Sequence, residues 1–206
     1  MEQAFTTIYD KNKWGGSGTG SKMSRNNQNY IDLLKQVISD YDIHTICDVG
    51  CGDWQFSQHI GYDQMDVSYL GIDCVKSVVT TLQNTYQSDN IIFDHKVIGD
   101  YIPKGYDLLI LKDVIQHWTD EDIIQILPQL LKHNRYVFLT NGYKFMRDPS
   151  KNKLTKRCIE NQYRYHPVDI DKYPLSEFKS YCIQTSTYFS KQMNLLTYCD
   201  NIDTQS

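Results

Sequence analysis

The segment with the densest chemical content runs from Asp48 to Trp54 and reads DVGCGDW. Gly50 and Gly52 allow a tight turn and let the backbone approach a ligand without a Cβ atom in the way. The carboxylate of Asp48 beside this turn favours a cationic ligand and repels a pyrophosphate. A dinucleotide-binding fingerprint would need a third glycine where Gln55 stands. The segment therefore favours a site for a positively charged nucleoside over one for a dinucleotide.

A second carboxylate, Asp73, ends the apolar run that begins at Tyr69. It lies about twenty residues past the glycine turn, the spacing at which an acid ending a second strand meets ribose hydroxyls. A carboxylate accepts two hydrogen bonds from a diol, so we expect Asp73 to bind a ribose. The alternative is an N-cap role for a helix that begins at Val75.

A third group, KDVIQH, ends at His117. His117 is its only side chain with an ordinary pKa near neutrality, which makes it the candidate general base. Asp113 would orient an acceptor or tune a neighbouring charge, and Lys112 could bind a carboxylate or phosphate. The alternative is that His117 only packs against Trp118, ahead of a helix whose N-cap is Thr119.

Residues 141–174 are polar, aromatic and irregular. Loops longer than about fifteen residues without structure of their own are usually functional or disordered. We expect acceptor-binding side chains here, although a surface loop whose tyrosines pack on the sheet is an alternative. The candidates are Asn141, Tyr163, Arg164, Tyr165 and Asp169.

Alternating strands and helices must position these groups. Apolar periodicity predicts a helix at about 27–40, then strands at 44–49, 68–73, 90–95, 106–111 and 135–140, and helices at 55–60, 75–86 and 119–131. This alternation indicates an α/β fold, a parallel sheet with helices on both faces, whose ligands bind beyond the carboxyl ends of the strands. Two further strands, 177–188 and 192–199, predict a C-terminal hairpin.

Composition narrows the choice of partners. The 206 residues, 40% hydrophobic and 22% charged, suit a single domain, 1–206. The formal charge of -4 makes nucleic acid an unlikely partner. The chain has no apolar run for a membrane span and no secretory signal at its start, so we expect a cytoplasmic protein, in the host cytoplasm if it is viral. The cysteine spacing predicts free thiols and no metal site.

The three motifs together resemble those of class I methyltransferases that use S-adenosyl-L-methionine (SAM) and release S-adenosyl-L-homocysteine (SAH). More narrowly, the chain is similar to small bacterial and giant-virus-like methyltransferases that open with a W-G-G-S-G-x-G-S loop, which begins here at Trp14, and carry D-x-G-C-G-D-W and K-D-V-x-Q-H. The likeness covers about residues 8–199. It implies a Rossmann-like, mostly parallel seven-stranded sheet, SAM as the cofactor and no metal.

The resemblance also implies which residues contact SAM. Residues 8–25 would form an N-terminal lid in which Trp14 covers the cofactor, and residues 141–176 an acceptor-side loop. Members of this class often carry an acid that touches the adenine amino group, but Val97 stands there, so the backbone of Val97 and Ile98, or Asp94 or Asp100 instead, would hold the adenine edge. The expected cofactor-binding residues are Trp14, Ser17, Gly18, Asp48, Gly50, Gly52, Asp53, Trp54, Asp73, Cys74, Val97, Ile98, Lys112 and Asp113.

The acceptor is the least determined feature. We expect an O-methyltransferase whose acceptor is a small polar molecule, a sugar, nucleotide-sugar or related metabolite by analogy. The alternatives are methylation of a protein or nucleic-acid amine, and a methyltransferase-like partner protein that only binds the cofactor. The sequence leaves the oligomeric state and the methylated atom open.

Overall fold

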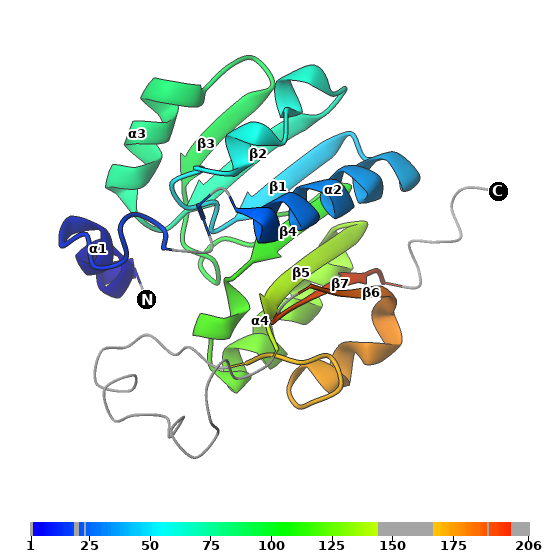
Figure 1. Cartoon of the computed structure of the whole chain (residues 1–206). Coiled ribbons are helices and arrows are strands. Elements are labelled where there is room, and N and C mark those ends of the chain that lie inside the picture. Colours follow the sequence, from blue (N-terminus) through cyan, green and yellow to red (C-terminus); the bar gives the residue numbers. More distant parts are fainter. Residues whose placement is uncertain (1, 19–20, 23, 144–166, 189, 199–206) are drawn as a thin grey trace. The chain divides into compact units, whose positions relative to one another are not determined.

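The computed structural model describes residues 2–18, 21–22, 24–143, 167–188 and 190–198 (Figure 1). The chain divides into two compact units, a first unit of Glu2–Tyr101 and a second unit of Ile102–Ser206, and each is described by itself. Three of the expected acceptor-side residues lie outside the described residues, namely Tyr163, Arg164 and Tyr165, and so do Cys158 and Cys199.

The first unit contains a parallel three-stranded sheet in the order β3-β2-β1. Its helices and strands are α1 (Glu2–Asp10), α2 (Arg25–Asp40), β1 (Thr45–Val49), β2 (Ser68–Asp73), α3 (Lys76–Tyr86) and β3 (Ile91–His95), with short 3-10 turns η1 (Ser57–His59) and η2 (Tyr62–Gln64). All of β1 except its first residue is buried, as expected for a parallel strand covered on both faces.

Helix α2 shows how the sequence builds this unit. The hydroxyl of Ser24 accepts a hydrogen bond from the backbone N–H of Asn27 and so caps the helix. Tyr30, Leu34 and Val37 recur at three- and four-residue spacing and are buried. The amphipathic stripe therefore sets which face of α2 turns inward.

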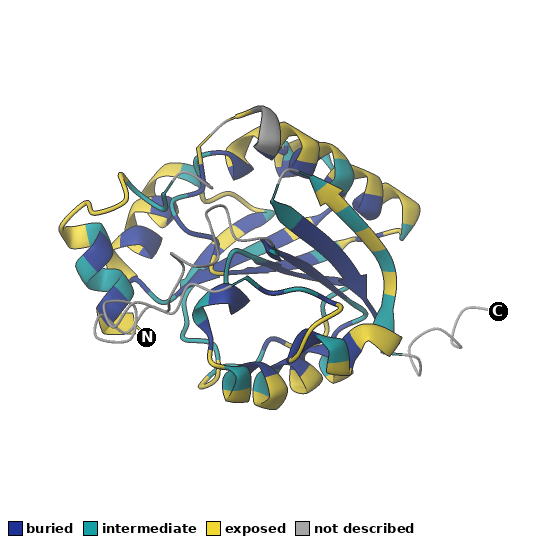
Figure 2. Ribbon diagram, turned by 60° about the horizontal axis from the view of Figure 1, so that its bottom comes forward, coloured by how far each residue is buried: buried dark blue, intermediate teal, exposed yellow. Residues whose placement is uncertain are grey.

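The second unit contains the strands β4-β5-β7-β6 in that order. Strands β4 and β5 are parallel, whereas β7 is antiparallel to both β5 and β6. The elements are β4 (Leu108–Lys112), η3 (Ile115–His117), α4 (Asp120–His133), β5 (Tyr136–Gly142), η4 (Leu175–Tyr181), β6 (Cys182–Tyr188) and β7 (Lys191–Leu196). Figure 2 shows the central strands as the most buried elements, while the helices alternate between buried and exposed residues.

The expected fold class is confirmed. The strands form a mostly parallel seven-stranded sheet, β3-β2-β1-β4-β5-β7-β6, which ends in a C-terminal antiparallel hairpin. The strands predicted at 68–73, 90–95 and 135–140 match β2, β3 and β5 closely.

Three local predictions were wrong. Residues 177–181, expected in a strand, belong to η4, because Leu175 and Phe178 are buried three residues apart, the period of a 3-10 helix. The helix expected at 55–60 is the three-residue turn η1. Helix α1 takes the first residues of the expected lid loop, because Ala4 and Ile8 form a short buried stripe.

Three further features bear on function. The described cysteines, Cys47, Cys51, Cys74 and Cys182, are free thiols, as expected. Within the described ranges, no three His, Cys, Asp or Glu side chains gather closely enough to hold a metal ion. In the same ranges, no helix is both long and apolar enough to cross a bilayer.

Candidate functional site

The glycine turn closes directly on the end of the neighbouring strand. The backbone N–H groups of Gly50 and Cys51 donate to the carbonyl of Ile72 at 2.8 and 3.1 Å. Gly50 and Gly52 have φ angles of 71° and 60°, in the left-handed region that favours glycine. A Cβ atom on Gly52 would lie 2.5 Å from the Oγ of Ser17. The side chain of Ser17, from the N-terminal loop, therefore fills the position that a Cβ atom on Gly52 would take.

Asp53 fastens that loop to the turn. The N–H of Ser17 donates to Asp53 Oδ2 at 2.8 Å, and the N–H of Asp53 donates back to Ser17 Oγ at 2.7 Å. The hydroxyl of Tyr9 on α1 shares a short hydrogen bond with Ser17, and Ser21 donates to Asp53 Oδ1. Asp53 is thus an anchor of the loop, a role that the sequence did not distinguish from cofactor contact.

The two remaining loop candidates lie close to each other. The ring of Trp14 packs edge-on against Phe5 of α1, with 6.1 Å between centroids, and is 37% exposed. A Cβ atom on Gly18 would lie 3.7 Å from the Cβ of Trp14. Trp14 is therefore supported by α1 and is still accessible, and its covering of a cofactor stays a prediction.

A tyrosine orients Asp48. The hydroxyl of Tyr69 donates to Asp48 Oδ2 at 2.8 Å and accepts from Trp54 Nε1 at 3.0 Å. Asp48 pairs with Gly71 in the β1–β2 register, so Tyr69, two residues earlier on β2, is its diagonal neighbour on the same face. Trp54 has a φ of 58°, an uncommon backbone state that tends to occur at functional sites. Sequence reasoning missed Tyr69 because only the strand register brings it to Asp48.

Asp73 is buried and held by backbone amides. Its Oδ2 accepts from the N–H of Gly52 at 3.1 Å, and its Oδ1 accepts from the N–H of Val75 at 2.9 Å. Burial raises the pKa of this carboxyl, while the amides of Val75 and Gly52 partly oppose the rise. The N-cap alternative was wrong, because the N-cap of α3 is Val75 and no side chain caps the helix.

The acids give the turn a negative potential. Burial first, and then the charges of Asp73 and Asp48, raise the pKa of the Cys51 thiol well above its usual value. Burial and the Asp48 charge also raise the pKa of the hydroxyls of Tyr62 and Tyr69. Because a negative potential disfavours every anion nearby, the turn suits a cationic ligand.

The candidate adenine contacts follow β3. The N–H of Lys96 donates to the carbonyl of Asp73 at 3.1 Å, so the segment that carries Val97 and Ile98 begins beside the end of β2. Both residues are half-buried. The carbonyl of Cys74 lies 3.0 Å from His95 Nε2.

In the second unit, Asp113 lies between two lysines. Its Oδ2 accepts from Lys112 Nζ at 3.1 Å, and its Oδ1 forms a short ion pair with Lys191 Nζ. Burial would raise the pKa of this carboxyl, but the two ammonium groups outweigh it and lower the pKa to about 2. Asp113 has a φ of 62°, and its N–H donates to the carbonyl of Thr140 at 2.7 Å. Sequence reasoning missed Lys191, which is 78 positions away along the chain.

His117 is half-buried in η3, immediately before α4. The N-cap expected in the alternative is confirmed, because Thr119 and Asp122 form a reciprocal capping box. The neighbouring Gln116 accepts from the N–H of Gly142 at 3.3 Å, which ties the motif to β5. The cap leaves the role of His117 as a base untested.

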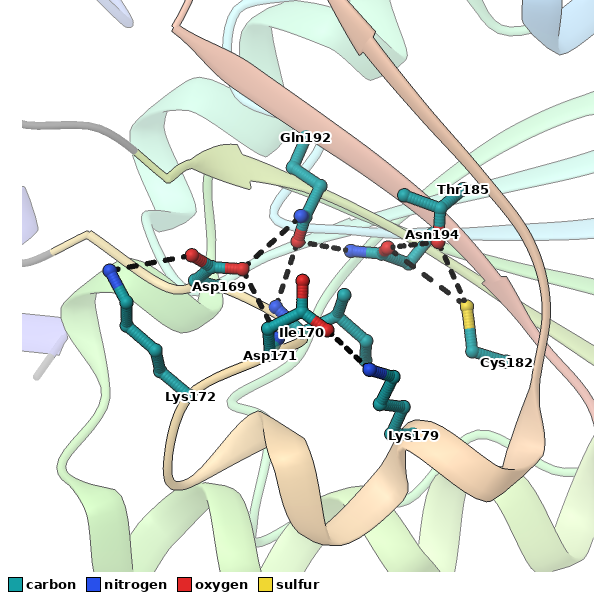
Figure 3. Close-up of polar contacts among 9 residues, drawn as sticks. All are labelled: Asp169, Ile170, Asp171, Lys172, Lys179, Cys182, Thr185, Gln192 and Asn194. Carbon is teal, nitrogen blue, oxygen red and sulfur yellow. Dashed lines mark hydrogen bonds and ion pairs between the residues drawn. The ribbon is translucent and has the colours of Figure 1, made fainter.

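The two described acceptor-side candidates differ. Asn141 is only 2% exposed, and its Oδ1 has no hydrogen-bond partner in the part of the chain that the structure describes. Asp169 is engaged with its surroundings, because its Oδ1 accepts from Gln192 Nε2 at 3.3 Å and from the N–H of Asp171 at 3.1 Å (Figure 3). Lys172 lies 3.6 Å from its other oxygen. Asp169 therefore helps to hold its own segment against β7.

The predicted site residues fall into two sets, one in each unit. The first unit holds Trp14, Ser17, Gly18, Asp48, Gly50, Gly52, Asp53, Trp54, Asp73, Cys74, Val97 and Ile98. The second unit holds Lys112, Asp113, His117, Asn141 and Asp169.

Comparison with known proteins finds methyltransferases among the solved structures. The chain is similar to the magnesium protoporphyrin IX methyltransferase of Synechocystis with bound SAH, at 16% identity and a TM-score of 0.59, over 84% of each chain. It is also similar to the methyltransferase domain of bacterial-CtHen1-C, at 14% identity and a TM-score of 0.62, over 84% of this chain and 98% of that one. Human N-acetylserotonin methyltransferase in complex with SAM gives 16% identity and a TM-score of 0.55, with 82% of this chain and 54% of that one covered.

The same comparisons find no matching protein-family model and no matching curated protein. The chain spans about half the length of the human enzyme. At these identities the likeness concerns the fold, and the chain has the Rossmann-like fold of class I methyltransferases.

Proposed function

We propose that this chain transfers the methyl group of SAM to a small polar acceptor, at a hydroxyl oxygen of a sugar, nucleotide-sugar or related metabolite. The observation that carries the proposal is the acid-lined glycine turn, where Asp48 and Asp73 end neighbouring parallel strands. Two solved structures of the same fold contain SAM or SAH, which supports this choice of cofactor.

The residues of the turn fit SAM by charge and by hydrogen-bonding capacity. The pKa of the Cys51 thiol is raised by burial first and then by the charges of Asp73 and Asp48, and these negative charges favour the ammonium and the sulfonium of SAM. Asp73 would accept a hydrogen bond from the ribose diol, since a carboxylate has about four acceptor sites and this one accepts from three backbone amides, those of Gly52, Val75 and Cys74. Val97 and Ile98 would line the adenine.

The protein's contribution to the reaction is alignment and proton removal. SAM supplies a methyl group already activated by its positive sulfur, which leaves as the thioether SAH. Holding donor and acceptor in line contributes about 7–11 kcal/mol toward the barrier. His117 takes the proton of the acceptor hydroxyl as the oxygen–carbon bond forms, a role that typically adds about 10²–10⁴-fold.

Incubation of the full chain with labelled SAM and a metabolite pool tests the proposal, followed by identification of the labelled product. We expect label on an oxygen of a small molecule. Label on a protein or nucleic-acid amine would overturn the acceptor assignment. An absence of SAH binding by calorimetry would overturn the function itself.

The variant His117→Ala tests the proposed base. It should keep SAH affinity while transfer falls by about 10²–10⁴-fold, because only the proton acceptor is removed. His133→Ala is the matched control, since His133 is also half-buried and ends α4 in the same unit. Equal turnover in the two variants would exclude His117 as the base.

A further inference from the structure

One edge of the second unit gathers lysines on a single face of the sheet. Lys112 at the end of β4 pairs in register with Thr140 of β5, and Gly142 of β5 pairs with Lys191 of β7. Because side chains alternate between faces with a period of two, these four positions share one face. Gly142 is buried and carries no side chain, so Lys112, Thr140 and Lys191 supply the side chains at these positions.

Lys191 has donor capacity to spare. Its ammonium pairs with Asp113, which is its only hydrogen-bond or ion-pair partner among the described residues. A lysine ammonium offers three N–H donors, so two remain. The Lys191 side chain is 20% exposed, and the buried hydroxyl of Thr140 has no partner in the described part of the chain. The edge therefore contains unused hydrogen-bonding groups of the kind that bind an anion.

The charges point the same way. Lys112 and Lys191 together carry two positive charges, and the carboxylate of Asp113 between them carries one negative charge. The Lys112 side chain is only 9% exposed, and its ammonium is paired with Asp113. Asp113 pairs with both ammonium groups, so one positive charge is unbalanced among these three side chains, and an oxyanion placed against the remaining donors of Lys191 would balance it.

We propose that Lys191, together with Lys112, forms a binding site for an oxyanion, a carboxylate or a phosphate, carried by the methyl acceptor. This inference rests on the proposed function, since it assigns the anion to the acceptor of that reaction. It narrows the acceptor to an anionic metabolite, such as a phosphorylated or carboxylated sugar, and disfavours a neutral one. Asp113 is a positioning residue here, because it holds both ammonium groups at the edge.

Titration of the full chain with inorganic phosphate, and separately with acetate, tests the site. The readout is the NMR signal of the side-chain CH₂ groups next to the lysine ammonium groups. We expect saturable shifts of the Lys191 and Lys112 signals in the wild type. The affinity of each variant is followed on the Lys112 signal, and should be at least about tenfold weaker in Lys191→Met and near wild type in Lys191→Arg. The probe with the higher affinity identifies the group on the acceptor.

Lys179→Met is the matched control. Lys179 lies in the same unit and pairs with Asp171 at 2.6 Å, but its side chain is 63% exposed (Figure 3). This variant should bind both probes like the wild type. Binding that is equal in Lys191→Met and Lys179→Met, or no saturable shift in the wild type, would overturn the site.

A second experiment separates this inference from the proposed function. SAH binding by calorimetry should be unchanged in Lys191→Met, while labelled SAM should transfer methyl faster to a phosphorylated acceptor than to its unphosphorylated counterpart. Normal SAH binding with transfer to neutral acceptors only would overturn the oxyanion site and leave methyl transfer standing. If the wild type does not bind SAH, the proposed function is overturned, whatever the result of the phosphate titration.

Discussion

The two units hold carboxylates at strand ends in opposite electrostatic settings. In the first unit, Asp73 accepts from backbone amides and Asp48 from a tyrosine hydroxyl. In the second unit, Asp113 lies between the ammonium groups of Lys112 and Lys191. The pKa of Asp73 is raised by burial, whereas that of Asp113 is lowered to about 2 because the lysines outweigh burial.

This difference indicates what each edge is suited to bind. Neutral donors orient an acid without cancelling its charge, so the glycine turn keeps a negative potential that favours a cation. Cationic donors more than cancel the charge of Asp113, so that edge favours an anion.

The largest expected effect on cofactor binding comes from Gly52→Ala. The alanine would sit at a φ of 60° with its Cβ 2.5 Å from Ser17 Oγ. The left-handed backbone costs about 1–2 kcal/mol, and displacement of Ser17 would cost two hydrogen bonds at about 1 kcal/mol each. We expect SAH affinity, measured by calorimetry, to fall roughly a hundredfold.

Gly105→Ala is the control for this variant. Gly105 also has a positive φ, of 82°, but a Cβ there would meet nothing within 4 Å. We expect a small loss of thermal stability and unchanged SAH affinity. If Gly52→Ala also left SAH affinity unchanged, the glycine turn would not be the cofactor site.

The next effect concerns pH. Against the effect of burial, the two lysines lower the pKa of the Asp113 carboxyl from its usual 3.8 to about 2, so its contribution to stability is present above about pH 4 and is lost as pH falls toward 2. The shift corresponds to about 2 kcal/mol. The free energy of unfolding in urea, measured from pH 5 to pH 2, should therefore decrease less in Asp113→Asn than in the wild type. Parallel pH profiles in variant and wild type would show that the lysines do not stabilise the folded chain through this carboxylate.

Asp73 is expected to affect the pH dependence of stability in the opposite direction. Its raised pKa means that the folded chain binds a proton more readily than the unfolded chain, so its contribution to stability falls as pH rises through the folded pKa. Asp73→Asn should therefore reduce the decrease in stability as the pH is raised from about 4, in urea unfolding followed upward from that pH. If the two variants changed the pH dependence of stability in the same direction, this would contradict the contrast drawn between the two edges.

The smallest effect is expected from Tyr69→Phe. The change removes the hydroxyl that orients Asp48 and keeps the ring in place. A hydrogen bond to a charged group contributes about 1.5–3 kcal/mol, but water can replace part of it, so we expect a loss of roughly fivefold in SAH affinity. Tyr86→Phe is the control, because the ring of Tyr86 also packs on Trp54, at 5.0 Å between centroids. Equal affinities in both variants would remove Tyr69 as a positioning residue.

The sequence was most informative where burial is continuous. Residues 108–111 are wholly buried, and apolar runs of this kind predicted the parallel strands. It was least informative where the same sequence pattern is compatible with two structures. Burial alternates along β6, around Ile183, as expected for a strand. The polar and apolar residues of η4 before it continue a similar pattern, which is why the strand was predicted to begin at 177.

For the candidate site, local motifs singled out Asp48, Gly52, Asp73 and Asp113 as candidates, because glycines and acids at strand ends are readable from the sequence alone. The partners of these residues were not readable. Tyr69 reaches Asp48 only through the β1–β2 register, and Lys191 reaches Asp113 only through the pairing of β7 with β5. Such contacts depend on tertiary structure, which local sequence patterns do not specify.

The mutual hydrogen bonds of Ser17 and Asp53 have a kinetic consequence. A molecule that replaced Ser17 beside Gly52 would have to break these two bonds first. Exchange by that route would then be a first-order step, with a maximum rate set by how often Ser17 leaves Asp53, whatever the concentration of the incoming molecule.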